Sequence, residues 1–173
     1  MNTKSRIIEG LYAFVAQRPG MDPRDYDTYA SYRSLSRDVT RDRHIAERLI
    51  GAIAWRASIT AEDIVDASRR AYSGRLEITQ GYRVNGEGFV TSIDAAQERA
   101  RGYLPLIVTI ESAIKIDYCT GQCWPTEYRK AVCAVCAQCL WSYWRANGYE
   151  TGDAIRKQAR KELGATITRR FFR

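Results

Sequence analysis

The chain has 173 residues, of which 45% are hydrophobic and 27% charged, and its formal net charge at neutral pH is +7. This size and composition predict one globular domain with a core that needs no disulfide bonds, and they exclude a chain that is disordered over long segments. We expect neither a secreted nor a membrane protein. The start carries charges in place of a signal sequence, and every apolar run falls far short of the ~20 residues that span a bilayer.

The first third of the chain predicts two helices. Apolar residues recur at helical spacing over Thr3–Gln17, and Pro19-Gly20 ends that helix. A linker rich in turn-forming residues continues to Asp27, and a long amphipathic helix is expected over Thr28–Arg56. Its charged side carries the only histidine, His44, which we expect at the surface.

Short local signals predict the next helix and a hairpin. Thr60, followed by Asp63, predicts the cap of a helix over Ala61–Tyr72. Asn85-Gly86 lies between two alternating runs, which is the strongest short signal for a β-hairpin, and we place the hairpin at Leu76–Val90, with a mobile loop as the alternative. A lone hairpin is marginally stable, so it should pack on helices or on a partner.

The segment after the hairpin is harder to assign. Ser92 begins another helix, which Pro105 kinks or ends. The run Leu106–Ile116 is apolar enough for a buried helix or a buried strand, and its periodicity does not separate the two.

All five cysteines lie in or just before a helix that we expect to begin at Pro125 and to end at Asn147-Gly148. On a helical wheel, Cys133, Cys136 and Cys139 share one sector of an apolar half. Buried cysteine behaves as a small hydrophobic residue, so the favoured interpretation is that these three thiols are core side chains.

The alternative interpretation is a thiolate site for zinc or an iron–sulfur cluster. Cys119, Cys123, Cys133, Cys136 and Cys139 together offer enough thiolates for four ligands. Against this, Cys133 and Cys139 lie nearly two turns apart on one helix, too far to share one tetrahedral ion. Cys119 and Cys123 suit redox chemistry or a disulfide bond better. The odd number of cysteines and their clustering indicate a reducing cytosol.

The last 24 residues, 150–173, carry seven Lys or Arg and three Asp or Glu. We expect a helix over Gly152–Leu163 with one basic edge, followed by a tail in which arginine is interleaved with phenylalanine. The helix suits phosphates and the tail suits stacking on single-stranded nucleic acid. Alternatively, Phe171 and Phe172 fold back on the core and the tail arginines point to water. The residues predicted to bind nucleic acid or a partner are Arg156, Lys157, Arg160, Lys161, Arg169, Arg170 and Arg173.

These elements predict a mainly α fold: a single compact helical domain over residues 1–173, with about five to seven helices and a small β-hairpin. The chain has no phosphate-binding loop, nucleophile elbow, zinc-protease motif or dinucleotide-binding motif, and one histidine excludes His-rich metal sites. We therefore expect a binding protein rather than an enzyme, and no cofactor.

Five segments carry a family resemblance: Asp117–Gln122, Pro125–Arg129, Gly152-Asp153, Ile155–Lys157 and Ala159–Glu162. Over Gly102–Arg173 the chain resembles a group of small, uncharacterised accessory proteins encoded by bacteriophages and prophages. The resemblance implies a phage accessory protein in the cytoplasm of a bacterial host cell, and it implies no particular chemistry.

Three functional hypotheses follow. Small phage accessory proteins commonly act on host machinery, so the first is a protein that binds and inhibits a host nucleoprotein defence complex, as anti-CRISPR-type inhibitors do. The second rests on the basic charge and is a DNA- or RNA-binding protein of phage replication or regulation. The third is the Cys-ligated metalloprotein. The expected partner is a host protein or nucleoprotein complex, or nucleic acid itself, and no membrane.

Overall fold

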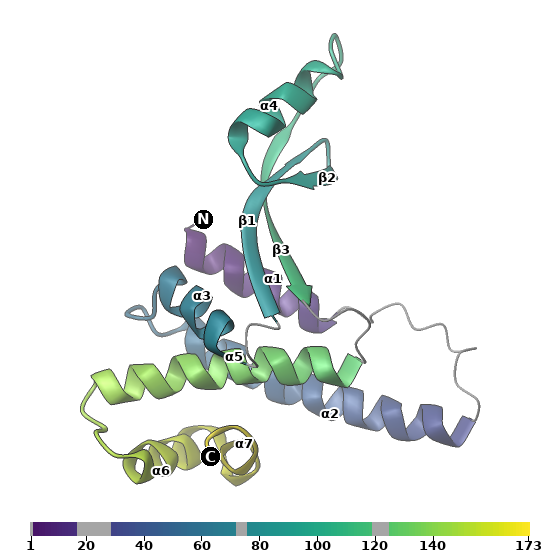
Figure 1. The fold of residues 1–173 in the computed structure, drawn as a ribbon. Coiled ribbons are helices and arrows are strands. Elements are labelled where there is room, and N and C mark those ends of the chain that lie inside the picture. Colours follow the sequence, from purple (N-terminus) through teal and green to yellow (C-terminus); the bar gives the residue numbers. More distant parts are fainter. Residues whose placement is uncertain (1, 17–28, 72–75, 119–124) are drawn as a thin grey trace.

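The computed structural model describes residues 2–16, 29–71, 76–118 and 125–173, and it confirms a mainly α fold (Figure 1). The described residues form seven helices and one three-stranded antiparallel sheet, so the predicted hairpin belongs to a larger sheet. The expected linker up to Asp27 lies outside these residues. The helices are α1 (Thr3–Ala16), α2 (Tyr29–Ala54), α3 (Ala61–Arg70), α4 (Ile93–Arg101), α5 (Pro125–Ala146), α6 (Gly152–Leu163) and α7 (Ala165–Phe171), and the strands are β1 (Leu76–Val84), β2 (Glu87–Val90) and β3 (Ile110–Tyr118).

Helix α5 is the centre of the helical body. It packs along α2, with α1 and α3 on one side and with α6 and α7 on the other (Figure 1). Most of the described residues of its predicted apolar half are buried, with Tyr143 half-buried, and Ala131 and Ala137 on the opposite half are buried too. Helix α5 is therefore enclosed on more sides than its amphipathic pattern indicates, because α6 and α7 fold back against it.

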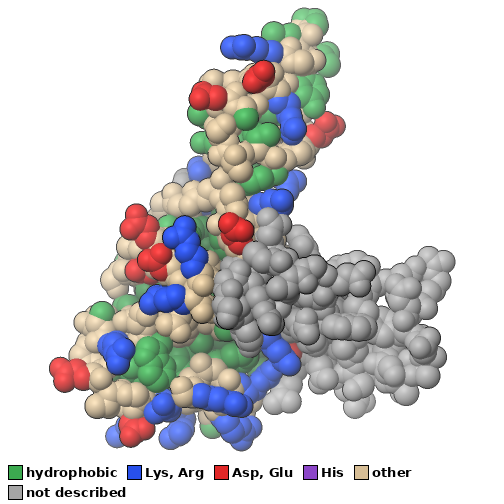
Figure 2. All heavy atoms as spheres, in the orientation of Figure 1, with side chains coloured by type: hydrophobic (Ala, Val, Ile, Leu, Met, Phe, Trp, Pro, Cys, Tyr) green, Lys and Arg blue, Asp and Glu red, His purple; other side chains and the backbone are tan. Residues whose placement is uncertain are grey.

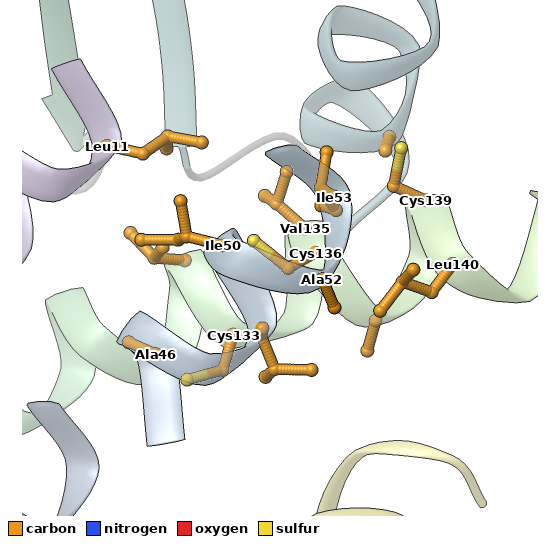
Figure 3. Close-up of a cluster of buried hydrophobic side chains, with 14 of the residues drawn as sticks. Leu11, Ala46, Ile50, Ala52, Ile53, Cys133, Val135, Cys136, Cys139 and Leu140 are labelled. Atoms are coloured by element: carbon orange, nitrogen blue, oxygen red, sulfur yellow. The ribbon is translucent and has the colours of Figure 1, made fainter. Parts of the chain in front are cut away.

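The core includes the three described cysteines (Figure 3). Cys133, Cys136 and Cys139 are 1%, 0% and 3% exposed, which confirms that they pack as core side chains. The three thiols leave α5 on different turns and do not point at one another: Cys133 lies beside Ala46 of α2, and Cys139 points towards α3 (Figure 3).

Local signals set the helix ends, as the sequence predicts. The Thr60 hydroxyl accepts a hydrogen bond from the Asp63 amide at 3.2 Å, and the Asp63 carboxylate accepts one from the Thr60 amide at 2.8 Å. This reciprocal capping box begins α3. Helix α6 is capped by the hydroxyl of Thr151. Gly148 and Gly164, with φ of 99° and 91°, follow the ends of α5 and α6, where a left-handed residue is usually glycine.

The sheet has the strand order β2-β1-β3. Asn85 and Gly86, at φ of 52° and 72°, form the predicted turn between β1 and β2. Strand β3 pairs with all nine residues of β1. This pairing decides the ambiguous run Leu106–Ile116, whose second half is a strand.

The sheet links two packed regions. At one end, Ile78, Ile114 and Ile116 join the core of the helical body. There α1 approaches β3 closely at Gly10, where a Cβ would lie 3.1 Å from the Ile114 side chain. The other end projects from the body together with α4, and we call residues 82–112 the arm (Figure 1). Val84 and Ala96 are fully buried in the arm, apart from the main core.

The tip of the arm exposes aliphatic side chains. Leu104, Leu106 and Ile107 are 68%, 67% and 94% exposed, and hydrophobic side chains cover the top of the arm in Figure 2. The prediction that Leu106–Ile116 is buried throughout is therefore wrong for its first residues, because the chain turns between α4 and β3 beyond any packed surface.

The carboxyl-terminal tail folds as helix α7. Phe172 is buried, with its ring 5.7 Å from the ring of Trp144, and Phe171 is half-buried. This confirms that the phenylalanines fold back on the core, and the burial of Phe172 excludes stacking of a base on that ring. His44 lies at the surface, as predicted, with its side chain 72% exposed.

Candidate functional site on the carboxyl-terminal helices

Helix α6 has one apolar face and one basic face. Ile155, Ala159 and Leu163 recur every four residues and pack against the body. The opposite face carries three exposed cations, Lys157, Arg160 and Lys161.

Helix α7 adds three arginines. Arg169 and Arg173 are exposed, and the Arg173 Nε donates a hydrogen bond to the Arg169 carbonyl at 3.3 Å. Arg170 is half-buried and forms an ion pair with Asp42 of α2 at 3.0 Å, where the Asp42 side chain is only 8% exposed. This contact joins α7 to the body.

Arg156 is engaged within the fold. Its Nε donates to the Phe172 carbonyl at 3.0 Å, and its guanidinium pairs with Asp153 at 3.1 Å. The same guanidinium lies 5.5 Å from the centre of the Trp141 ring. Arg156 thus ties α6 to α7 and to α5, which leaves it less available to a partner than the exposed cations.

Three carboxylates near these helices are already paired. Asp153 pairs with Arg156, Glu162 with the buried Arg56, and Asp42 with Arg170. Positive charge gathers at the lower end of the molecule, over α6 and α7 (Figure 2). Five of the predicted cations remain, and we call them the basic surface: Lys157, Arg160, Lys161, Arg169 and Arg173. Within the residues that the structure describes, no carboxylate forms an ion pair with any of them.

A pocket of about 430 Å³ opens between α3, α5 and α7, and we call it the arginine pocket. Its cations are Arg70, in the last turn of α3, together with Arg170 and Arg173. Helix α5 contributes Ala134, Gln138 and Trp141, and α7 adds Phe171.

The sequence does not predict this pocket. Trp141 lies outside the apolar half of its helix, and Arg70 and Gln138 carry no local signal that separates them from ordinary surface residues. They become neighbours of Arg170 only through the packing of α3 and α7 on α5. In retrospect, the small residues Ala134 and Ala137 next to the polar Gln138, outside the apolar half of α5, are a weak indication of a pocket there.

The described cysteines are buried thiols. Burial raises the pKa of Cys133 and Cys139 to about 12, and that of Cys136 well above its usual range, so these thiols are protonated at neutral pH. Among the described residues, no three His, Cys, Asp or Glu side chains are arranged to hold a metal ion. Cys119 and Cys123 lie outside those residues.

Comparison of the chain with models of protein families, with curated proteins and with solved structures finds no match. The resemblance to phage accessory proteins therefore stays an expectation from the sequence.

None of the helices in the described part is long and apolar enough to cross a membrane.

Proposed function

We propose that this protein acts by binding a host nucleoprotein complex, as anti-CRISPR-type inhibitors do, and that the basic surface contacts the nucleic acid of that complex. The observation that carries the proposal is the set of five exposed cations on α6 and α7 that no described carboxylate neutralises. Cations at helical spacing suit a line of phosphates, because each contact releases a counterion from the nucleic acid.

The distribution of charge supports a target with two kinds of surface. The arm contains three basic and four acidic residues, for a net charge of −1, so the rest of the chain carries +8. Phosphates attract the body and not the arm. The exposed aliphatic tip instead suits an apolar protein surface, because contiguous exposed apolar residues commonly mark protein contacts. A nucleoprotein offers both surfaces.

The first test measures binding of labelled single strands and duplexes as a function of salt. Four or five phosphate contacts give a plot of log affinity against log salt concentration with a slope of about −3 for single strands. Replacing Lys157 and Lys161 by glutamine should reduce that slope by about one to two units. The matched control removes two cations from the arm, as Arg83→Gln and Arg101→Gln, and should leave the slope unchanged.

The second test is capture from host lysate, with and without nuclease. We expect the tagged protein to retain a nucleoprotein, and the Lys157→Gln, Lys161→Gln variant to retain less. Failure to bind any strand at low salt and to retain any nucleoprotein would contradict the proposal. Retention of nucleic acid without protein would favour the other candidate, a nucleic-acid-binding protein of phage replication or regulation, which the same basic surface supports.

A further inference from the structure

We propose that the arginine pocket is a binding site for a nucleotide that carries a terminal phosphate monoester, either as a free mononucleotide or as the end of a single strand. Binding of a strand end, but not of a free mononucleotide, rests on the proposed function, because a strand held by the basic surface would bring its end to the neighbouring pocket.

The charge of the pocket matches a dianion. Arg70, Arg170 and Arg173 line it, and Asp42 neutralises Arg170. No ion pair involves Arg70 or Arg173 among the described residues, which leaves two positive charges. A phosphate monoester carries about −1.5 to −2 at neutral pH, whereas the diester within a strand carries one charge. Guanidinium groups also match phosphate oxygens in shape, through paired hydrogen bonds.

The lining between the arginines suits a planar base. Trp141 and Phe171 provide aromatic surface, and Ala134 leaves space above α5 that a larger side chain would fill. The Gln138 amide can both donate and accept, as recognition of a base edge requires. The volume of about 430 Å³ falls within the range of ~300–1,000 Å³ of small-molecule sites.

Several of these side chains are held in place before any ligand binds. The buried Asp42 fixes Arg170, and the guanidinium of Arg156 lies against the Trp141 ring. Arg70 and Arg173 each donate from Nε to a backbone carbonyl one turn earlier, at 3.3 Å, which leaves the two outer guanidinium nitrogens for a ligand. A site held in this way loses less entropy when it binds.

The test compares ligands that differ only in the features named. Calorimetry or NMR titration of the full chain would use a nucleoside monophosphate, the matching nucleoside, inorganic phosphate, and single-stranded oligonucleotides with and without a terminal phosphate. We expect the monophosphate to bind more tightly than either the nucleoside or phosphate alone. The phosphorylated strand should bind more tightly than its unphosphorylated form, which binds through the basic surface.

Two variants assign the effect to the pocket. Replacing Arg70 and Arg173 by glutamine should weaken binding of the monophosphate about ten- to a hundredfold, because charge-assisted hydrogen bonds are lost. Ala134→Leu, which fills the pocket and keeps its charge, should also abolish that binding. The control variant Lys157→Gln, Lys161→Gln should weaken phosphorylated and unphosphorylated strands by the same factor.

The outcomes separate this inference from the proposed function. Equal affinity for phosphorylated and unphosphorylated strands, with no binding of the monophosphate, would overturn the inference and leave the proposed function standing. Binding of the monophosphate without binding of any strand would support the pocket and contradict a role of the basic surface. If Ala134→Leu keeps its native circular dichroism and still binds the monophosphate, the pocket is not the site.

Discussion

At the scale of single residues, the buried arginine Arg56 joins three parts of the helical body. Its guanidinium donates to the Ala52 carbonyl at 2.6 Å and pairs with Glu162 of α6. It also lies 4.1 Å from the ring centre of Trp55 and 5.0 Å from that of Tyr143. The position of α6, and with it the basic surface, therefore depends on a charge inside the fold.

We expect Arg56→Met to lower the free energy of unfolding by about 1–3 kcal/mol, because the partly buried Glu162 carboxylate loses its partner. The double variant with Glu162→Gln should recover part of that loss. Urea unfolding monitored by circular dichroism measures both. A double variant no more stable than Arg56→Met would show that aromatic packing, and not the ion pair, is what the arginine contributes.

The buried thiols make stability depend on pH in the alkaline range. Burial raises the pKa of Cys133 and Cys139 from 9.0 to about 12. Between these values the native state keeps protons that the unfolded chain releases, so the free energy of unfolding is highest below pH 9 and falls as pH rises towards 12. The slope is up to about 1.4 kcal/mol per pH unit for each thiol.

Unfolding measured from pH 8 to pH 11 in the wild type and in Cys133→Ala, Cys139→Ala checks this. We expect the double variant to be less stable at pH 8, since side-chain volume is lost. It should also have a shallower decline with pH. Parallel curves would show that other groups, such as the third buried thiol Cys136 or the tyrosines and lysines, cause the alkaline loss rather than these two thiols.

At the scale of elements, the arm depends on close packing between β1 and β2. A Cβ at Gly81 would lie 2.3 Å from the Val90 carbonyl oxygen and 2.5 Å from the Phe89 ring. We expect Gly81→Ala to destabilise the arm by about 1–3 kcal/mol, as overpacking does. Hydrogen exchange should then rise at amides of residues 82–112 more than in the helical body.

Gly51 in α2 is a matched control for that change. An added Cβ there would meet only the Tyr12 hydroxyl, at an ordinary 3.5 Å. Gly51→Ala should therefore stabilise the body by up to about 1 kcal/mol through helix propensity. If hydrogen exchange in the Gly81→Ala variant rose equally in the arm and in the helical body, the arm would not be a separately packed region.

Local rules predict most of the elements but not their assembly. Thr60, Asn85-Gly86 and Gly148 act on residues within a few positions of themselves, so the sequence predicts the elements they begin or end. The pairing of β1 with β3 joins segments about thirty residues apart, and no turn signal specifies its register. The site divides in the same way: the cations of α6 and α7 follow from composition, whereas Arg70 reaches the pocket only through tertiary packing.

At the scale of the whole molecule, charge and apolar surface are segregated. The basic surface lies on α6 and α7 at the lower end of the molecule in Figure 2, and the exposed aliphatic side chains lie at the far end of the arm. A target that touches both ends must present phosphates and an apolar protein surface in one assembly, which is the arrangement that the proposed function requires.

We expect Leu106→Ser, Ile107→Ser to separate the two contacts. Both side chains are exposed, so the free energy of unfolding should change by less than about 0.5 kcal/mol. Affinity for single strands should also be unchanged, while retention of the protein part of the nucleoprotein after nuclease treatment should fall. Unchanged retention would show that the arm tip takes no part in the interaction.

The nine-residue strands β1 and β3 run without interruption from the helical body into the arm. At ~3.3 Å per residue, each spans about 30 Å. A ladder of backbone hydrogen bonds, rather than a flexible tether, thus keeps the two ends of the molecule apart. The protein would then bind only those assemblies in which the phosphates and the apolar protein surface are separated by the distance between the basic surface and the tip of the arm.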